Sequence, residues 1–278
     1  MDKDNNIKLD FNVPSVQIPP QEEFLKFKKN VEKLINLDLT NYKNAQMERR
    51  IVSFMNKHKI FKLDDYFQLL KNSEEQLAEF VNMLTINVSE FFRNPEKFVE
   101  LKETYLKEMI KAKPNLKIWS AGCSIGAEVY SVAMILDELG ALGKCQLIAS
   151  DFDQKILNKA QSGIYSKEEV GTVPAQYKKY FTVLDAVKGT YVIDKKITSS
   201  VKFQRQDLLN SHFEKGFDII ICRNVVIYFT DEAKDKLYQK FSDALIPGGY
   251  LFIGSTERIN NHKGFGLDTA TTFFYKKV

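Results

Sequence analysis

Residues 116–151 read LKIWSAGCSIGAEVYSVAMILDELGALGKCQLIASD. A short β-rich run leads into a loop with Gly122 and Gly126, an amphipathic helix follows, and a second apolar run ends at Asp151. Strand, glycine loop, helix, strand and terminal acid form the unit with which α/β folds hold a nucleoside. The glycines let the backbone approach the ligand, and the acid can accept both ribose hydroxyls. The segment predicts an adenosine-containing cofactor, with a plain strand-to-helix turn as the alternative.

The same loop argues against a phosphate ligand. Neither a G-x-G-x-x-G fingerprint nor a loop ending in G-K-[ST] occurs in the sequence. Glu128 falls in the first turn of the expected helix, where its charge would repel a pyrophosphate but could receive a cationic amine. A nucleoside with a ribose, no phosphate and an amino-acid tail describes S-adenosylmethionine, whose demethylated product would be S-adenosylhomocysteine.

Composition is that of an ordinary globular protein without a membrane or metal role. Of 278 residues, 44% are hydrophobic and 27% are charged, and the most apolar run, 217–229, carries Asp218 and Arg223. The N-terminus lacks the pattern of a signal peptide. The cysteines form no CxxC pair and the histidines stand singly, so we expect reduced thiols, a cytoplasmic location and no metal site; these residues are Cys123, Cys145, Cys222, His58, His212 and His262.

Positive charge gathers near the N-terminus. Residues 21–60 hold nine Lys and Arg against five Asp and Glu, an excess equal to the net charge of +4 of the whole chain. Lys43, Arg50 and Lys57 recur at seven-residue spacing beside the apolar face of an expected helix, and Arg49 lies further round. An acidic macromolecular partner would bind such a stripe, although a solvated surface is the plainer explanation.

Pattern and punctuation divide the chain into parts. Residues 1–20 are polar and contain three prolines, which indicates a flexible tail. Residues 21–95 are expected to form a helical domain, and 96–278 an α/β domain with a largely parallel sheet. Residues 165–205 break the alternation and predict a small antiparallel insertion without an obvious helix. The expected strands are 116–121, 145–150, 217–222, 249–254 and one in 271–277, and the expected helices are 127–139, 153–162 and 231–245.

Three further segments carry polar groups where a cofactor could meet them. In TINVSEFFRNPEKF (85–98), Arg93 follows two phenylalanines that could anchor it near the sheet; a helix start at Ser89 is the alternative. In FQRQDLL (203–209), a strand ending at Asp207 could bring an acid to the adenine amine, unless this is a surface turn. In FDIIICRNVVIYF (217–229), a buried strand ends in polar residues that would face the ligand crevice.

Together these segments resemble the chemoreceptor glutamate methyltransferases of bacterial chemotaxis, the CheR type. The similarity runs from about residue 25 to 278 and includes LTNYKNAQMERR, NVSEFFR, WSAGCS…AEVYS, ASDFDQKILNKAQSGIY, FDIIICRNVVIYF and PGGYLFIGSTE. It implies a Rossmann-like S-adenosylmethionine-dependent methyltransferase domain, an N-terminal all-helical domain and an inserted antiparallel β-subdomain that docks on receptors. It also implies protein-glutamate O-methyltransferase activity on receptor cytoplasmic helices.

The resemblance also carries over roles for particular residues. Arg93 and Tyr228 match the positions nearest the transferred methyl group. The basic residues of the first domain, Lys43, Arg49, Arg50 and Lys57, correspond to the surface that meets acidic receptor helices. The implied cofactor contacts are Asn87, Ser89, Arg93, Glu128, Asp151, Asp207, Leu208, Arg223 and Asn224.

The chain departs from the family in its glycine loop. The usual S-T-G-E-E-P-Y stands here as Ser124-Ile125-Gly126-Ala127-Glu128-Val129-Tyr130, so a threonine, a glutamate and a proline are replaced. This departure motivates an alternative, an adaptor or sensor that binds S-adenosylmethionine with weakened or lost catalysis. A nucleic-acid methyltransferase ranks lower because an NPPY-type motif is absent. We expect a monomer that binds neither nucleic acid nor membrane.

The expected reaction needs orientation more than proton transfer. A glutamate side chain has a reference pKa of about 4.3 and is already ionised at neutral pH, so no general base is required. Arg93 and Tyr228 would hold the incoming carboxylate, while Asp151 and Glu128 fix the ribose and the amine of the cofactor.

Overall fold

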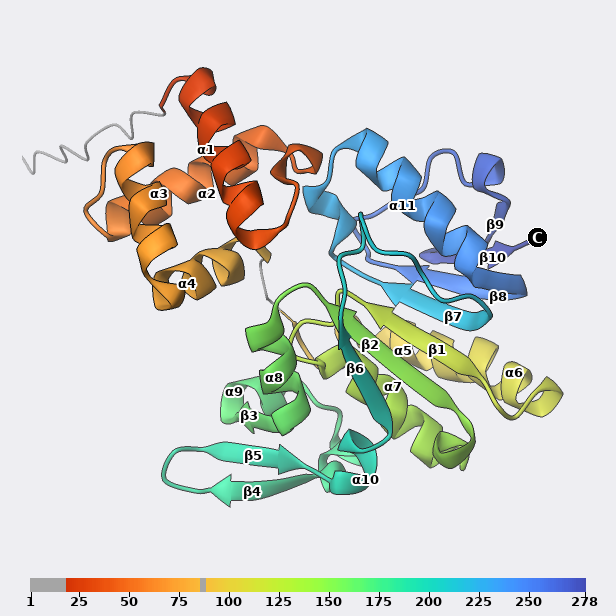
Figure 1. Ribbon diagram of the computed structural model, residues 1–278. Coiled ribbons are helices and arrows are strands. Elements are labelled where there is room, and N and C mark those ends of the chain that lie inside the picture. The colour runs from red at the N-terminus through yellow and green to blue at the C-terminus, as the bar shows by residue number, and fades with distance from the viewer. Residues whose placement is uncertain (1–18, 86–88) are drawn as a thin grey trace, which may run out of the picture.

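The computed structural model describes residues 19–85 and 89–278, so most of the expected N-terminal tail and Asn87 lie outside the described residues. A helical domain and a larger sheet domain are visible side by side (Figure 1). The first consists of α1 Gln21–Ile35, the 3₁₀ turn η1 Leu39–Asn41, α2 Asn44–Lys57, α3 Leu63–Asn72 and α4 Glu74–Thr85. Its core gathers aromatic and aliphatic side chains of all four helices, among them Phe27, Ile51, Tyr66 and Phe80.

A buried ion pair fixes α2 against α1. Lys28 Nζ lies 2.8 Å from Glu48 Oε1, and both side chains are buried. Lys28 also donates to Asn44 Oδ1 at 2.9 Å, and Gln21 Nε2 donates to Glu48 Oε2 at 2.9 Å. Because removing one partner of a buried pair leaves an uncompensated charge, this network defines one orientation of α2.

The sheet domain contains the predicted, largely parallel sheet. Its strand order is β6-β2-β1-β7-β8-β10-β9. The first five strands pair in parallel, and β10 pairs antiparallel with both β8 and β9. The strand order reverses between β1 and β7, and ligands bind at such a switch point. The strands are β1 Lys117–Ala121, β2 Gln146–Asp151, β6 Val201–Arg205, β7 Phe217–Cys222, β8 Leu245–Ile253, β9 Leu267–Thr271 and β10 Phe274–Lys277.

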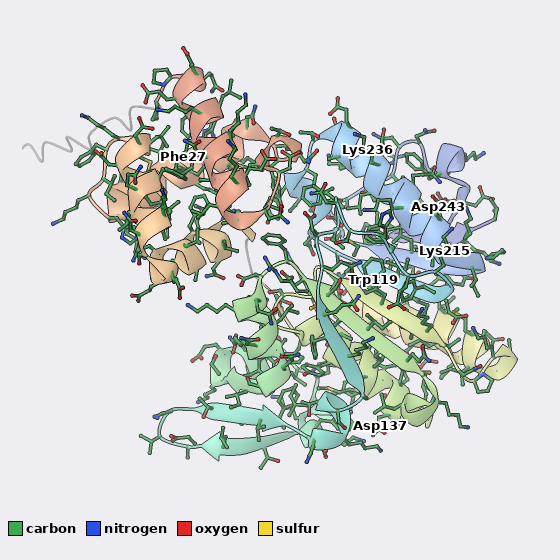
Figure 2. The ribbon with its side chains drawn as sticks, viewed as in Figure 1. Phe27, Trp119, Asp137, Lys215, Lys236 and Asp243 are labelled. Atoms are coloured by element: carbon green, nitrogen blue, oxygen red, sulfur yellow. The ribbon has the colours of Figure 1, made fainter. Side chains whose placement is uncertain are left out.

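Helices cover both faces of this sheet, as the alternation of expected strands and helices along the chain predicts. Side chains such as Ile118 pack with α7, and side chains such as Trp119 pack with α11 on the other face. Figure 2 shows Trp119 between the sheet and α11. The elements on the first face are α5 Pro95–Glu100, the π-helical turn η2 Leu101–Leu106, α6 Lys107–Ala112, α7 Ala127–Glu138 and α8 Gln154–Ser162, and α11 Asp231–Ala244 covers the second. Short 3₁₀ turns occur at η3 Leu142–Lys144, η5 Val226–Tyr228 and η6 Lys263–Phe265.

The antiparallel insertion is present but differs from its prediction in two ways. Its sheet, ordered β3-β5-β4, is shorter than expected, because Val201–Arg205 forms β6 at the edge of the main sheet. An edge strand is buried on few positions, so β6 lacks the apolar run that marked the inner strands. The insertion also contains short helices: its elements are β3 Ile164–Ser166, α9 Lys167–Gly171, η4 Ala175–Tyr180, β4 Phe181–Asp185, β5 Thr190–Ile193 and α10 Lys195–Thr198.

The two domains meet through a short antiparallel bridge. Tyr42 pairs with Phe229, and their rings make an edge-to-face contact at 5.1 Å. Lys43 N donates to Tyr228 O at 2.9 Å, and Thr230 N donates to Asn41 O at 2.8 Å. The start of α2 is therefore bonded to the loop that follows β7.

The junction residues Phe91 and Phe92 already belong to the core of the sheet domain. The last helix of the first domain ends at Thr85. The expected boundary at residue 95 stays a prediction, which this packing does not favour.

Replacement of Trp119 by Phe should lower the free energy of unfolding by about 1–3 kcal/mol. Trp119 is 1% exposed and its indole N–H donates to Ser150 Oγ at 2.9 Å, so the variant removes this donor and leaves space beside Phe213 and Phe241. Urea titration followed by circular dichroism measures the change. Phe61→Ala is the control, because Phe61 is 77% exposed and should shift stability by no more than about 0.5 kcal/mol.

Candidate active site

A cavity opens at the carboxyl ends of β1, β2, β6 and β7, between the two domains. The loops that follow these four strands form its floor, and residues of the helical domain form part of its wall. Every predicted cofactor or catalytic residue within the described ranges lines it: Ser89, Arg93, Glu128, Asp151, Asp207, Leu208, Arg223, Asn224 and Tyr228. Asn87 cannot be placed, since it lies outside these ranges.

The glycine loop packs closely against neighbouring segments of the protein. Gly122 has φ +76°, and a Cβ atom there would lie 2.6 Å from a methyl group of Val225. Gly126 has φ +81° at the start of α7. Non-glycine side chains rarely adopt such a backbone, so both positions require glycine. Between them, Ser124 also has a positive φ of 50° and turns its N–H toward the end of β2.

Asp151 joins the glycine loop to β2. Its carboxylate accepts hydrogen bonds from Ser124 N at 2.8 Å and from Asp153 N at 3.0 Å. Burial raises the pKa of this carboxyl, and the two N–H donors oppose the shift. A carboxylate has about four acceptor positions, so Asp151 retains two that can accept the hydroxyls of a ribose.

Glu128 and Arg223 place opposite charges at the other end of the cavity. Glu128 accepts from Ser120 Oγ at 3.0 Å and lies 3.6 Å from Arg223 Nη1. Burial raises the pKa of Glu128 and lowers that of Arg223, and each charge opposes the shift of the other. The Arg223 guanidinium also donates to Asn94 Oδ1 at 2.7 Å and lies over the Phe252 ring at 4.7 Å. Glu128, which was predicted to bind the amine of the cofactor, is thus one partner of a buried ion pair.

Unsatisfied polar atoms support the fit of an amino-acid group in this cavity. Ser124 Oγ and Arg223 Nε are buried and have no hydrogen-bond partner within the described part of the chain. Buried polar atoms are ordinarily paired, so these two indicate a polar ligand. Glu128 offers a negative charge for an ammonium group, and the Arg223 and Arg93 guanidinium groups offer positive charge for a carboxylate. The donor set fits S-adenosylmethionine.

The segment before α5 is anchored by its aromatic pair, as predicted. Phe91 packs edge-to-face on Tyr165 at 4.9 Å, and Phe92 stacks on Tyr177 at 4.5 Å. Phe92 N donates to Ser131 Oγ at 3.0 Å. These contacts direct Arg93 into the cavity wall. The alternative of a helix start at Ser89 is wrong, because α5 begins at Pro95.

Asp207 forms a turn and also borders the cavity, while its contact with an adenine amine stays a prediction. Its carboxylate caps a turn by accepting from Leu209 N at 2.9 Å and Asn210 Nδ2 at 2.8 Å, and it also lines the cavity. The preceding strand ends at Arg205 and not at Asp207. Beyond it, Gln206 N still donates to Asp151 O at 2.9 Å. Leu208 follows as a buried wall residue.

Tyr228 lies between two arginines. Burial raises the pKa of its hydroxyl, and the positive charges of Arg50 and Arg93 act in the opposite direction. Arg50 is half-buried, and its guanidinium donates to the backbone oxygen of Met83. Its expected contact with a receptor stays a prediction, and the structure places Arg50 in a second pocket that also includes Tyr228.

A second pocket adjoins the first at Tyr228 and is formed mainly by α2. Its lining comprises Tyr42, Lys43, Gln46, Met47, Arg49, Arg50, Leu84 and Tyr228. Lys43 and Arg49 are exposed at its rim. Lys57 does not line this pocket, and its ammonium group lies 5.4 Å from the Phe54 ring. Three of the four predicted receptor contacts therefore gather beside the cavity.

Several wall residues were missed by the sequence analysis. Leu37, Tyr42 and Leu84 come from the helical domain, and only the tertiary bridge to Phe229 brings Tyr42 to the cofactor cavity. Phe152 directly follows Asp151, so its place in ASDFD was a usable signal. It packs against the helical-domain core and lies 4.9 Å from the Arg205 guanidinium.

Neither a membrane-spanning helix nor a metal-binding cluster is present in the ranges 19–85 and 89–278. No helix there is both long and apolar enough to cross a membrane. No group of three or more His, Cys, Asp or Glu side chains in these ranges could hold a metal ion.

The affinity for S-adenosylmethionine should fall as the pH is lowered from about 8 to about 5. A protonated Glu128 cannot attract an ammonium group, and its raised pKa makes this loss begin at a higher pH than for an exposed glutamate. Glu128→Gln should weaken binding about 10- to 100-fold at neutral pH and flatten the pH dependence. Calorimetry measures both effects. Glu168→Gln, in the inserted subdomain, should retain the wild-type profile; an equally steep profile in Glu128→Gln would contradict this role.

Comparison with known proteins agrees with this geometry. The all-alpha domain of CheR methyltransferase matches residues 22–85, and the SAM-binding domain of CheR methyltransferase matches residues 87–273. The chain is 40% identical over 259 residues to a chemotaxis protein methyltransferase of Listeria monocytogenes, covering 93% of this chain and 98% of that protein. It is 34% identical over 251 residues to chemotaxis protein methyltransferase 1 of Pseudomonas aeruginosa, covering 86% and 91%.

Among solved structures, the glycopeptide N-methyltransferase MtfA complexed with S-adenosyl-L-methionine aligns with 50% of this chain and 43% of its own. Its TM-score of 0.32 and sequence identity of 12% are too low to support an inference about this site. The two family matches together span nearly all described residues, and they coincide with the helical domain and the sheet domain. The chain therefore belongs to the CheR methyltransferase family, and S-adenosylmethionine is its cofactor.

Proposed function

We propose that this protein transfers the methyl group of S-adenosylmethionine to glutamate side chains on the cytoplasmic helices of chemoreceptors. The observation that carries the proposal is the position of Tyr228, between Arg50 and Arg93 and at the junction of two pockets. One pocket has the charges for the cofactor, and the other is bordered by basic residues of α2. The names of the curated relatives, chemotaxis protein methyltransferase, support receptors as the substrate class.

The residues of this chain act by binding and orientation. S-adenosylmethionine supplies an activated methyl group when it is bound. Asp151 and Glu128 hold its ribose and its amine, while Arg93 and Tyr228 hold the acceptor carboxylate. Because that carboxylate is already ionised, the site needs no base to remove a proton. Fixed donors in a cavity of low polarity orient the reactants at little cost during reaction.

The substitutions in the glycine loop are compatible with turnover. Ile125, just before α7, and Ala127 and Val129, within α7, are buried in the core, and Tyr165 Oη donates to Ile125 O at 2.5 Å. Ser124 and Glu128, which line the cavity, keep the chemistry that the family uses. Neither the packing nor the comparisons support the alternative of a non-catalytic adaptor.

The remaining expectations belong to the same proposal. A protein that acts on receptor cytoplasmic helices works in the cytoplasm and needs no membrane insertion. Lys43, Arg49, Arg50 and Lys57 form the receptor-docking surface, and the inserted subdomain is a further docking element. We retain a monomer and the absence of nucleic-acid binding as parts of the proposal.

The proposal is tested by incubating the protein with labelled S-adenosylmethionine and purified receptor cytoplasmic fragments. A glutamate methyl ester is labile in alkali, so label that alkali releases from the receptor supports the function. Retained cofactor binding without any ester would instead support the adaptor.

Arg93→Ala should lower kcat on receptor fragments by on the order of 100-fold or more, since the guanidinium that holds the acceptor is removed. Initial rates of label transfer give kcat, and calorimetry shows how much cofactor affinity is lost separately. The exposed Arg258→Ala is the control and should keep the wild-type rate. Turnover near the wild-type rate in Arg93→Ala would remove Arg93 from the mechanism.

Charge reversal at the rim of the second pocket should weaken receptor capture and spare the cofactor. In the pair Lys43→Glu with Arg49→Glu, the KM for receptor fragments should rise about tenfold at low salt, with an unchanged Kd for S-adenosylmethionine. Lys29→Glu with Lys71→Glu changes the net charge equally at exposed sites on α1 and α3. If both pairs raise KM alike, the effect is one of net charge and the docking role is rejected.

A further inference from the structure

Glu257 is a buried carboxylate that binds backbone and not a cation. It follows β8 in the segment GSTE and is 7% exposed. Its oxygens accept hydrogen bonds from the N–H groups of Gly254 at 2.6 Å, Asn224 at 3.1 Å and Val226 at 3.1 Å. No Lys, Arg or His among the described residues pairs with it within 4.0 Å. The backbone donors are therefore its hydrogen-bond partners, and the positive charge of Arg223 also acts on it electrostatically.

The loop that Glu257 holds carries the centre of the active site. Residues 223–228 supply Arg223 and Asn224 to the cofactor cavity and Tyr228 to the acceptor side. Asn224 has a φ of 60°, a left-handed conformation that costs free energy in a non-glycine residue. Two of the three N–H donors to Glu257 belong to this loop, so the carboxylate stabilises a conformation that the loop would not adopt alone.

The atoms around the contact between Glu257 and the loop are tightly packed. A Cβ atom at Gly254 would lie 2.7 Å from Asn224 N and 2.7 Å from Glu257 Oε2. Burial raises the pKa of Glu257, and its backbone hydrogen bonds oppose the shift. An apolar side chain would avoid the cost of burial, but it could not accept three hydrogen bonds. A charge kept at this position indicates a function beyond filling space.

We infer that Glu257 is a positioning residue of the methyltransferase, which fixes Asn224 against the cofactor and Tyr228 against the acceptor without touching either ligand. Glu257 does not line the cofactor cavity and acts through the backbone of residues 224–226. The inference rests on the proposed function only for the acceptor side. For the cofactor side, the inference requires only that the protein binds S-adenosylmethionine.

The first test is Glu257→Gln, which keeps the shape and removes one carboxylate oxygen. We expect the Kd for S-adenosylmethionine to rise about tenfold or more and kcat to fall by a similar factor, while the KM for receptor fragments changes little. Asp218→Asn is the matched control. Asp218 is a 1% exposed carboxylate of β7 that binds Lys117 N at 2.7 Å and Lys113 Nζ at 2.9 Å, at the opposite end of the sheet. It should lose thermal stability and keep its Kd and kcat.

A second variant protects the test against a misfolded Glu257→Gln. Gly254→Ala keeps the Glu257 side chain chemically intact but presses on both Glu257 Oε2 and Asn224 N, so it should give the same rise in Kd and fall in kcat. Gly143→Ala is its control, because a Cβ there meets no atom within 4 Å. Wild-type cofactor affinity in folded Glu257→Gln or in Gly254→Ala would overturn the inference, as would equal losses in Asp218→Asn. If cofactor affinity falls as expected but no receptor fragment is methylated, the proposed function fails and the positioning role stands.

Discussion

The ion pair of Glu128 and Arg223 is the constraint on which the active site depends. Burial disfavours the charge of each side chain, and the opposite charge of its partner stabilises the ionised form. At 3.6 Å the pair is loose, and Arg223 Nε remains without a partner in the described structure. A ligand that brings both an ammonium and a carboxylate can satisfy each charge in turn. The site is therefore selective for a zwitterion before any contact with the nucleoside is considered.

Three carboxylates hold the loops around that pair. Asp151 bonds the glycine loop to β2, Asp207 caps the turn after β6, and Glu257 bonds the loop after β7. All three accept backbone N–H groups near the carboxyl ends of the strands, where loops lack the regular hydrogen bonds of a sheet. Because a charged acceptor forms stronger bonds than a neutral one, these loops are preorganised at the places where ligands bind.

The inner strands, the helices between them and the glycine loop could be predicted because their signals are local. Near-continuous burial marks β1 and β7, and Gly122 and Gly126 both have positive φ angles, which glycine adopts readily. The edge strand β6 lacked an apolar run and was assigned to the insertion. Tyr42 was not predicted at all, because only contacts between the domains bring it to the cavity. Arg50 was predicted as a surface residue, but it is half-buried and lines the adjoining pocket with Tyr228.

Those contacts also explain why a helical domain accompanies the sheet. Lys43, the residue before α2, bonds through its N–H to the carbonyl of Tyr228, and Arg50 from the same helix acts on the Tyr228 hydroxyl. Helix α2, which bears the proposed docking charges, thus has backbone and electrostatic contacts with Tyr228. If a receptor helix docks along α2 as proposed, these contacts hold it at a fixed distance from the cofactor cavity. In the proposed mechanism, the bridge between Tyr42 and Phe229 therefore links binding of the protein substrate to orientation of its glutamate.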